Sequence, residues 1–205
     1  KYGCTRDYVR AMTVVLPTGE IVKLGATVSK TSSGYSLLNL MIGSEGTLGI
    51  ITELTLKVIP APKSVISLII PYENLEDCIA TVPQFFMHHL APQALEFMEK
   101  EVVMDTEKFL GKQVYPKELE GTEIAYLLAT FDGNSEEQLE DIIEQASEVV
   151  LEAGAIDVLV ADTPALKKDA WAVRGALLEA IEADTVLLDE CDVVVPTNKI
   201  AEFLT

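Results

Sequence analysis

Gly43–Pro60 reads GSEGTLGIITELTLKVIP, and the interpretation of the whole chain starts from this stretch. Its glycines fall at positions 43, 46 and 49, and from Ile51 to Val58 apolar and polar residues largely alternate. Glycine allows a positive φ and lets a ligand approach the backbone closely, because it has no Cβ. A β-branched segment with period-two alternation is typical of a half-buried strand. The stretch therefore predicts a glycine turn that leads into a strand.

Two common phosphate-binding patterns do not fit this stretch. The dinucleotide fingerprint GxGxxG follows a strand and opens a helix, whereas here the glycines precede a strand. No GxxxxGK[ST] loop is present either. From composition alone, two interpretations stay open: a loop that contacts a ligand, and a plain tight connection, since glycine-rich turns are common between elements.

A hairpin and a short helix are expected before the glycine turn. Val9–Val15 and Glu20–Leu24 flank a Leu-Pro-Thr-Gly turn, and apolar runs on both sides of such a turn predict a β-hairpin. Tyr35–Ile42 is expected to form a short helix that ends at Gly43.

After Pro60 and Pro62 the pattern changes to strands that alternate with helices. The expected elements are, in order, strands at 64–70 and 94–98 around a helix that Asn74 begins, a charged insert over 99–121, and strands at 123–131 and 155–160 around a helix over 135–153. Ser135 and Gln138 are expected to form a capping box at the start of that last helix. Two strand–helix–strand units in tandem predict a ferredoxin-like sheet with helices on one face. We therefore divide the chain into residues 1–62 and 63–205.

Composition excludes several classes of function. The formal net charge of −18 disfavours nucleic acid and anionic membranes, whose binding depends on Lys and Arg. Cys4, Cys78 and Cys191 are odd in number and show no metal-ligand spacing, which indicates a reduced, cytoplasmic compartment. No apolar run approaches the roughly 20 residues of a membrane helix. The chain starts at Lys1 and ends in what reads as an incomplete helix, so we expect an interior piece of a longer protein.

Three segments resemble the FAD-linked oxidases of the vanillyl-alcohol oxidase superfamily. They are KYGCTRDYV at 1–9, SGYSLLNLMIGSEGTLGIITELTLKVIPAPK at 33–63, and DAWAVRGALLEAI at 169–181. The most similar branch contains the glycolate oxidase large subunit and D-lactate or D-2-hydroxyglutarate dehydrogenases. The resemblance implies an α+β fold, with residues 1–62 as the C-terminal part of an FAD-binding domain and residues 63–205 as a truncated, ferredoxin-like, substrate-side cap domain. Asp192–Pro196 resembles the strand that continues the cap sheet.

The resemblance also implies an FAD site in residues 1–62. In the resembled family, the first segment lies along the flavin and its pyrophosphate, and the glycine turn lies beside the adenosine half. The cofactor-binding residues implied in this way are Gly3, Thr5, Glu45, Gly46, Gly49 and Ile50. From the residues alone, Glu45 could equally be a solvated turn charge, and Asp7 is expected to bind amides of its own loop.

Arg174 is the candidate for substrate binding. On a helix expected over 163–183, it lies at the edge of the apolar face, where its stem could simply lie across Trp171. The resemblance implies another role, because Trp171 and Arg174 match the W-x-x-R motif whose arginine binds the substrate carboxylate. Relatives with a dicarboxylic substrate carry Thr and Lys at two positions where this chain has Leu178 and Glu190. These departures favour a monocarboxylic acid such as lactate or glycolate.

The function implied is part of an FAD-dependent 2-hydroxyacid dehydrogenase or oxidase that acts on D-lactate or glycolate. Hydride would pass from the substrate α-carbon to the flavin, and a base outside this chain would take the hydroxyl proton. An electron-accepting flavoprotein, an iron–sulfur subunit or a quinone would then take the electrons, and a homodimer stays open. This piece alone is expected to be inactive, because it lacks the loop that binds the FAD pyrophosphate.

No metal site is expected. His88 and His89 are adjacent, so on a helix they point about 100° apart and are assigned a structural or surface role. The alternative to an enzyme is a non-catalytic, ferredoxin-like binding or regulatory module. That alternative would explain residues 63–205 and leave the glycine block without a use.

Overall fold

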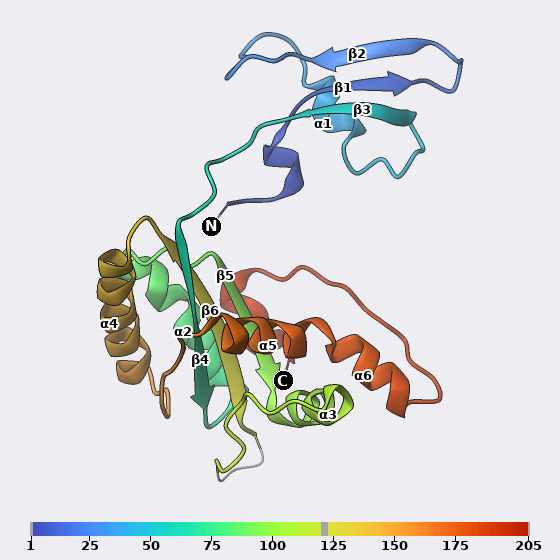
Figure 1. Ribbon diagram of the computed structural model, residues 1–205. Helices are drawn as coiled ribbons and strands as arrows, with labels where there is room; N and C mark the ends of the chain where they lie inside the picture. Colours follow the sequence, from blue (N-terminus) through green and yellow to red (C-terminus); the bar gives the residue numbers. More distant parts are fainter. Residues whose placement is uncertain (1, 120–122, 205) are drawn as a thin grey trace. The chain divides into compact units, whose positions relative to one another are not determined.

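The computed structural model describes residues 2–119 and 123–204 (Figure 1). Lys1, residues 120–122 and Thr205 lie outside the described residues, and they include the last two residues of the expected insert. The chain divides into two compact units, one from Tyr2 to Ala61 and one from Pro62 onward. Each unit is described by itself below.

The N-terminal unit is a three-stranded antiparallel sheet with one short helix. The strand order is β2-β1-β3. Its elements are η1 (Thr5–Asp7), β1 (Val9–Val15), β2 (Ile21–Gly25), α1 (Leu37–Met41) and β3 (Ile50–Leu56). The hairpin, the short helix and the glycine turn that leads into a strand were all predicted from the sequence and are present.

The core of this unit lies on one face of β1. Met12 and Val14 alternate along the strand and are buried, and they pack with Leu38 and Met41 of α1. The strand β3 is different, because all seven of its residues are exposed. The prediction of a half-buried strand was wrong on this point, since β3 is an edge strand and α1 packs against β1 and β2.

The C-terminal unit contains a four-stranded antiparallel sheet of order β5-β6-β4-β7. Its elements are β4 (Ser64–Tyr72), α2 (Leu75–Met87), β5 (Ala94–Glu99), α3 (Lys100–Leu110), β6 (Ala125–Gly133), α4 (Glu136–Glu152), β7 (Leu159–Ala161), α5 (Pro164–Gly175), α6 (Leu177–Asp184), η2 (Thr197–Lys199) and α7 (Ile200–Leu204). The first strands of the two strand–helix–strand units, β4 and β6, form the centre of the sheet. This is the ferredoxin-like arrangement that was expected.

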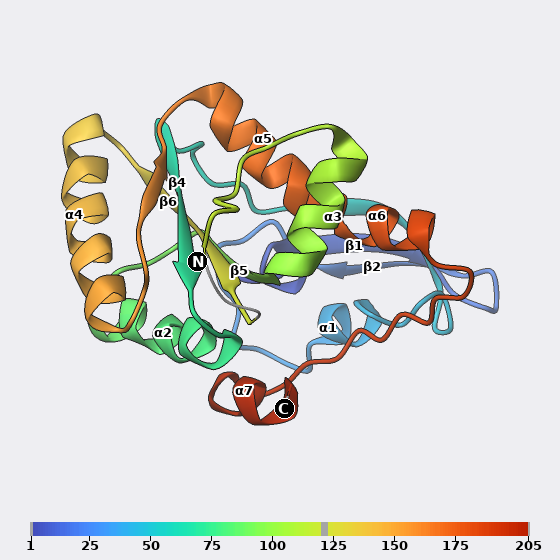
Figure 2. The same ribbon diagram turned by 90° about the horizontal axis from the view of Figure 1, so that it is seen from below.

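Helices cover both faces of this sheet, whereas the sequence analysis expected them on one. The crossover helices α2 and α4 pack on the face that carries Leu68 and Leu127, and α3 and α5 pack on the face that carries Ile69 and Leu128 (Figure 2). Burial on both sides explains why β4 and β6 are nearly continuous apolar runs instead of alternating ones. The second layer arises partly because the expected charged insert forms α3.

Side-chain caps begin the longer helices. Ser135 Oγ accepts a hydrogen bond from the Gln138 N–H at 3.2 Å, which confirms the cap expected for α4. Asn74 Oδ1 accepts from the Asp77 N–H at 2.8 Å and begins α2.

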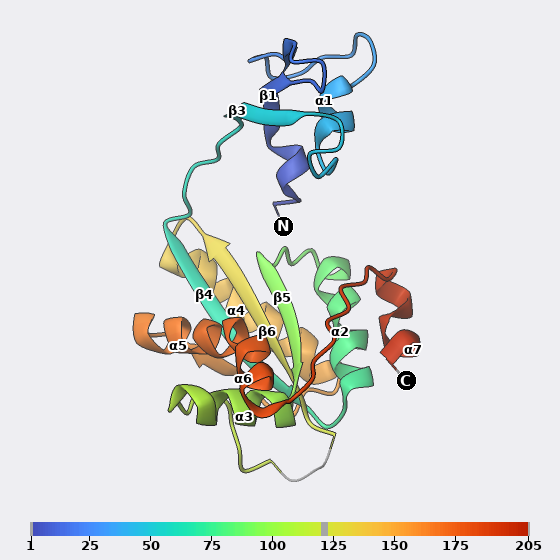
Figure 3. The ribbon, with the colours of Figure 1, turned by 90° about the vertical axis from the view of Figure 1, so that its right-hand side faces the viewer.

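At the other end of the chain, α7 lies beside α2 (Figure 3). None of the described helices has the length and apolar content needed to cross a membrane.

Two predictions near the C-terminus were wrong. The single helix expected over 163–183 is two helices, α5 and α6, which meet at Ala176 with φ −103° and ψ 10°. The strand expected at Asp192–Pro196 is irregular backbone, and Val194 there is fully exposed. A segment without a neighbouring strand to pair with has no ladder of hydrogen bonds to hold it extended.

Candidate functional site

The N-terminal loop is built around the carboxylate of Asp7. Asp7 Oδ2 accepts a hydrogen bond from the Cys4 N–H at 2.9 Å, so the prediction that Asp7 binds an amide of its own loop is confirmed. Gly3 adopts φ +81°, and a Cβ on it would lie 2.3 Å from Asp7 Oδ2. The positive φ favours glycine at this position, and a side chain there would also displace the Asp7 carboxylate. Thr5 begins the exposed turn η1 that follows.

Arg6 joins this loop to the glycine turn. Its Nη2 donates a hydrogen bond to the Ile42 carbonyl at 3.1 Å, across 36 residues of sequence. Two segments that were predicted to contact the same cofactor are thus neighbours in the N-terminal unit. The sequence analysis did not single out Arg6, although a cation beside a glycine turn is a suitable partner for phosphate oxygens. One sequence feature could have pointed to Arg6: it is a basic residue inside the KYGCTRDYV segment of a chain whose net charge is −18.

The glycine turn exposes two successive residues with positive φ. Glu45 has φ 51° and Gly46 has φ 77°. Within the turn, the Thr47 N–H and Oγ1 both donate to the Ser44 carbonyl, at 2.9 and 2.6 Å. The nearest atom to a Cβ on Gly46 would be Ile50 Cδ1 at 3.8 Å, so space is open on that side. Ile50 itself is 61% exposed.

Gly49 faces protein atoms. A Cβ on Gly49 would lie 2.7 Å from Val14 Cγ1 and 2.9 Å from the Val15 carbonyl oxygen. The absence of a side chain at Gly49 is therefore explained by the close approach of β1 to the start of β3. A ligand contact at its backbone stays a prediction, but this glycine does not need a ligand to account for it.

The residues of the N-terminal unit fit part of a nucleotide cofactor. The exposed Ile50 and the open side of Gly46 provide a surface on which a flat apolar ring could lie. The exposed guanidinium of Arg6 provides positive charge next to the same turn. Gly3 and Gly49, by contrast, are fitted to their own neighbours in the fold.

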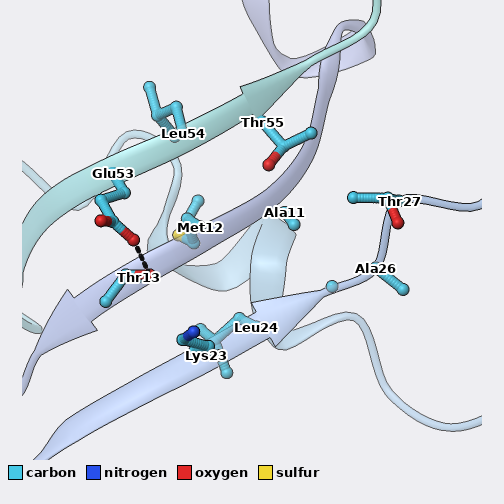
Figure 4. Close-up of a pocket in the computed structure, with 11 residues that line it drawn as sticks. Ala11, Met12, Thr13, Lys23, Leu24, Ala26, Thr27, Glu53, Leu54 and Thr55 are labelled. Carbon is cyan, nitrogen blue, oxygen red and sulfur yellow. Dashed lines mark hydrogen bonds between the residues drawn. The ribbon is translucent and has the colours of Figure 1, made fainter.

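A separate hollow of about 390 Å³ lies on the three-stranded sheet. It is lined by polar residues of all three strands, among them Thr13, Lys23 and Glu53 (Figure 4). Thr13 Oγ1 donates to Glu53 Oε2 at 2.7 Å across β1 and β3. None of the six predicted cofactor residues lines this hollow, so we do not assign it a role in cofactor binding.

Arg174 contacts a carboxylate in the C-terminal unit. It lies in the last turn of α5, directly after the buried Val173. Its Nε and Nη2 both donate to Glu96 Oε2 of β5, at 3.0 and 2.8 Å. The side chains are 44% exposed for Arg174 and 30% exposed for Glu96. The guanidinium therefore lies at the surface, bound to a carboxylate.

A chain of buried polar groups attaches α5 to the sheet. The Trp171 indole N–H donates to Ser67 Oγ at 3.3 Å, and Ser67 Oγ lies 2.8 Å from Thr130 Oγ1. On the preceding residue of the helix, the Ala170 carbonyl accepts from the Tyr115 hydroxyl at 3.2 Å. Trp171 of the predicted W-x-x-R motif is thus a structural anchor for the helix that carries Arg174.

Two lysines add to this attachment. Lys167 Nζ donates to the Val65 carbonyl of β4 at 2.6 Å. Lys112 forms an ion pair with Asp169 of α5. Together with the polar chain, these contacts attach the middle of α5, from Lys167 to Trp171, to the rest of the unit.

Glu107 is a fully buried carboxylate under the same helix layer. Its Oε1 accepts from the Val114 and Tyr115 N–H groups at 2.5 and 2.8 Å, and Lys117 Nζ lies 3.2 Å from Oε2. Burial raises the pKa of Tyr115, and the charge of Glu107 adds to this. Glu107 therefore fixes the loop after α3 that places the Tyr115 hydroxyl against α5.

The structure places the remaining predicted residues as follows. Leu178 lies on α6 and is 39% exposed, and Glu190 lies in the irregular segment after α6. His88 ends α2, and His89 follows with φ 61°. Across residues 2–119 and 123–204, no group of three or more His, Cys, Asp and Glu side chains could hold a metal ion.

Comparison with known proteins gives a consistent family. The profile of the family described as FAD linked oxidases, C-terminal domain, matches residues 61–205. The whole chain is 38% identical over 204 residues to D-lactate dehydrogenase of Archaeoglobus fulgidus, covering 99% of this chain and 43% of that protein. It is 33% identical over 211 residues to glycolate oxidase subunit GlcD of Bacillus subtilis, covering 100% of this chain and 42% of that protein.

The chain thus spans less than half the length of these relatives. Among solved structures, alkyldihydroxyacetonephosphate synthase matches with a TM-score of 0.64 at 20% identity, covering 89% of this chain and 34% of that one. At this identity the likeness concerns the fold alone.

Proposed function

The chain belongs to the FAD linked oxidases, whose C-terminal domain its residues 61–205 match, and we propose that it is part of an FAD-dependent 2-hydroxyacid dehydrogenase or oxidase acting on D-lactate or glycolate. One observation carries the proposal. The arginine of the W-x-x-R motif, Arg174, already binds a carboxylate in the structure, that of Glu96, through two N–H groups. This contact, together with the 44% exposure of the Arg174 side chain, supports a role for the guanidinium in binding an anion of the kind that a 2-hydroxy acid carries.

We assign residues 1–62 to the C-terminal part of the FAD-binding domain and residues 63–205 to the substrate-side cap. The residues that would hold FAD are Glu45, Gly46 and Ile50 in the glycine turn, with Arg6 as a cation for phosphate oxygens. Support comes from the open side of Gly46 and the exposure of Ile50. When bound, the flavin accepts the hydride removed from the substrate α-carbon.

The role of Arg174 is to bind and orient the substrate carboxylate. Paired N–H···O contacts between a guanidinium and a carboxylate fix the direction of the acid as well as its position. Orientation of this kind lowers the barrier because the reacting atoms are held in a productive geometry before reaction. The anchored helix α5, tied to Ser67 through Trp171, makes that geometry reproducible. The base that takes the hydroxyl proton lies outside this chain.

A monocarboxylic substrate agrees with the residues around the motif. Leu178 is apolar and Glu190 is acidic, so neither offers a positive partner to a second carboxylate. The relatives named D-lactate dehydrogenase and glycolate oxidase subunit act, by their names, on such acids. The relative from Bacillus subtilis is named as a subunit, which supports a partner protein as electron acceptor here. We expect an electron-accepting flavoprotein, an iron–sulfur subunit or a quinone.

The test is anaerobic reduction of the purified full-length protein. We expect a flavin spectrum that bleaches on addition of D-lactate or glycolate and does not bleach with D-2-hydroxyglutarate. Arg174→Ala should keep the flavin content and raise KM for the acid while lowering kcat, because it removes only the carboxylate contact. A protein without flavin, or one reduced only by the dicarboxylic acid, would contradict the proposal.

A further inference from the structure

We propose that Glu96 is a positioning residue that orients the Arg174 guanidinium and disfavours substrates with a second carboxylate. This inference rests on the proposed function, in which Arg174 binds the substrate. It concerns a side chain on β5 that lies 78 residues before Arg174 in sequence. No local sequence pattern connects the two residues.

The geometry of the contact leaves one edge of the guanidinium free. Nε and Nη2 donate to the same oxygen, Glu96 Oε2, at 3.0 and 2.8 Å, so Glu96 occupies the side edge of the planar group. Among the described residues, no other acceptor is bonded to Arg174. The end edge, formed by Nη1 and the second N–H of Nη2, can therefore take both oxygens of a substrate carboxylate.

Both residues stand on rigid parts of the fold. Glu96 is paired with Leu128 in the ladder between β5 and β6. Arg174 follows Val173, which is buried in the core under α5. The side-edge contact therefore fixes the plane of the guanidinium, which would otherwise rotate freely at the end of a long, exposed side chain.

The contact is poorly placed to stabilise the fold. Both side chains are partly exposed, at 44% and 30%, and ion pairs exposed to solvent contribute little to stability. Removal of Glu96 should therefore leave the fold intact. If a Glu96 variant loses activity, the cause would be the Arg174 guanidinium, which no longer has an acceptor to orient it.

The negative charge of Glu96 has a second consequence, for the choice of substrate. The pair is formally neutral, and one bound monocarboxylate leaves a single excess negative charge beside it. A second substrate carboxylate would lie within the roughly 8–10 Å over which charges act at physiological ionic strength. Glu96 would repel it, which agrees with a preference for monocarboxylic acids.

Two variants separate orientation from charge in the flavin-loaded, full-length enzyme. Glu96→Ala removes both the acceptor and the charge, and we expect kcat/KM for D-lactate to fall about tenfold or more, because small errors of position are costly in catalysis. Glu96→Gln keeps an acceptor oxygen at the same reach, so most of kcat for D-lactate should be retained. Because Glu96→Gln removes the charge, it should raise kcat/KM for D-2-hydroxyglutarate relative to D-lactate.

Binding is measured separately with 2-hydroxyisobutyrate, which lacks an α-hydrogen and cannot be oxidised. By calorimetry, Glu96→Ala should weaken its binding and Glu96→Gln should not. Glu140→Ala, which removes an exposed carboxylate from α4 on the opposite face of the sheet, is the matched control and should behave as the wild type. Flavin content and Tm should be equal in all these proteins.

A double-mutant cycle with Arg174→Lys completes the test. Because lysine has no planar edge to orient, Glu96→Ala should add little to the loss caused by Arg174→Lys. Additive losses would overturn the inference, as would tighter binding or faster turnover in Glu96→Ala, which would make Glu96 an internal competitor. If Arg174→Ala abolishes turnover while Glu96→Ala equals the wild type, only this inference fails. If Arg174→Ala is itself without effect, the proposed function fails.

Discussion

The indole N–H of Trp171 in α5 donates a hydrogen bond at 3.3 Å to the hydroxyl of Ser67, which lies 104 residues earlier in β4. Ser67 Oγ in turn lies 2.8 Å from Thr130 Oγ1 in a buried position. One hydroxyl therefore connects the helix that carries Arg174 to the two central strands of the sheet. The identity of residue 67 should matter for stability and for the candidate substrate site together.

Ser67→Ala should leave the buried hydroxyl of Thr130 and the partly buried indole N–H of Trp171 without their partner. An unsatisfied buried donor or acceptor costs about 1–3 kcal/mol, so we expect a lower free energy of unfolding in urea and a lower kcat with D-lactate. Ser64→Ala, on the same strand and without a described side-chain hydrogen bond, is the control. Wild-type stability in Ser67→Ala would mean that the hydroxyl chain is not a structural anchor.

Gly49→Ala and Gly46→Ala should have different effects. A Cβ at position 49 meets Val14 Cγ1 at 2.7 Å, and overpacking of this kind costs about 1–3 kcal/mol. We expect Gly49→Ala to destabilise the N-terminal unit, measured by hydrogen exchange of β1 amides.

Gly46→Ala meets no such clash, and its cost arises from φ 77°. We expect it to weaken FAD binding, measured by the flavin retained after dialysis, with a smaller effect on exchange in β1. Equal exchange rates in the two variants would contradict the packing role assigned to Gly49.

Glu107→Ala should be among the most destabilising single changes in the C-terminal unit. It would leave the Val114 and Tyr115 N–H groups without their acceptor in a buried loop, at roughly 1–3 kcal/mol for each group. Urea unfolding followed by Trp171 fluorescence measures the loss. Lys117→Ala should cost much less, because Lys117 is partly exposed and Glu107 keeps its two backbone donors. If the two variants lose comparable stability, the stabilising contribution of Glu107 comes from its ion pair with Lys117 and not from its backbone hydrogen bonds.

Stability should fall at alkaline pH. Burial raises the pKa of Tyr126 from 10.0 to about 12, and the charge of Glu107 adds to this shift. Because the pKa is higher in the folded state, stability is fully present below about pH 10 and is lost as the pH rises toward 12. Burial likewise raises the pKa of Cys78 from 9.0 to about 12, so the loss should begin near pH 9.

Urea midpoints measured from about pH 8 to about pH 11 follow the onset of this loss, which starts at the lower pKa values of the unfolded chain. Tyr126→Phe should be less stable at neutral pH, because it loses the 2.5 Å bond to the Pro116 carbonyl. It should nevertheless depend less steeply on pH above about 10, because the titrating group is gone. A slope equal to that of the wild type would assign the alkaline loss to other groups.

The prediction of elements succeeded where the signal is local. The caps at Asn74 and Ser135 and the apolar runs of β4 and β6 each depend on residues within a few positions of one another. It failed where packing decides. The insert over 99–121 forms α3 because Val103 is buried in the core, although the segment as a whole is charged.

The candidate site was predicted in part. The family resemblance pointed to Arg174 and to the glycine turn, and Asp7 was correctly assigned to its own loop. Arg6 and Glu96 were missed, because their partners lie 36 and 78 residues away. Only the folded structure shows that Arg6 contacts the Ile42 carbonyl and that Glu96 contacts Arg174.

The sequence by itself determined the strands of both sheets, the helices α1, α2 and α4, the glycine turn before β3, and the family to which the chain belongs. These follow from short-range periodicity, capping and motif residues, whose physics acts within a few positions. Only the tertiary structure decided that Gly49 accommodates Val14 and that Arg174 contacts Glu96. Those contacts depend on sheet register and on how helices pack across it, and no local pattern encodes which distant side chains will meet.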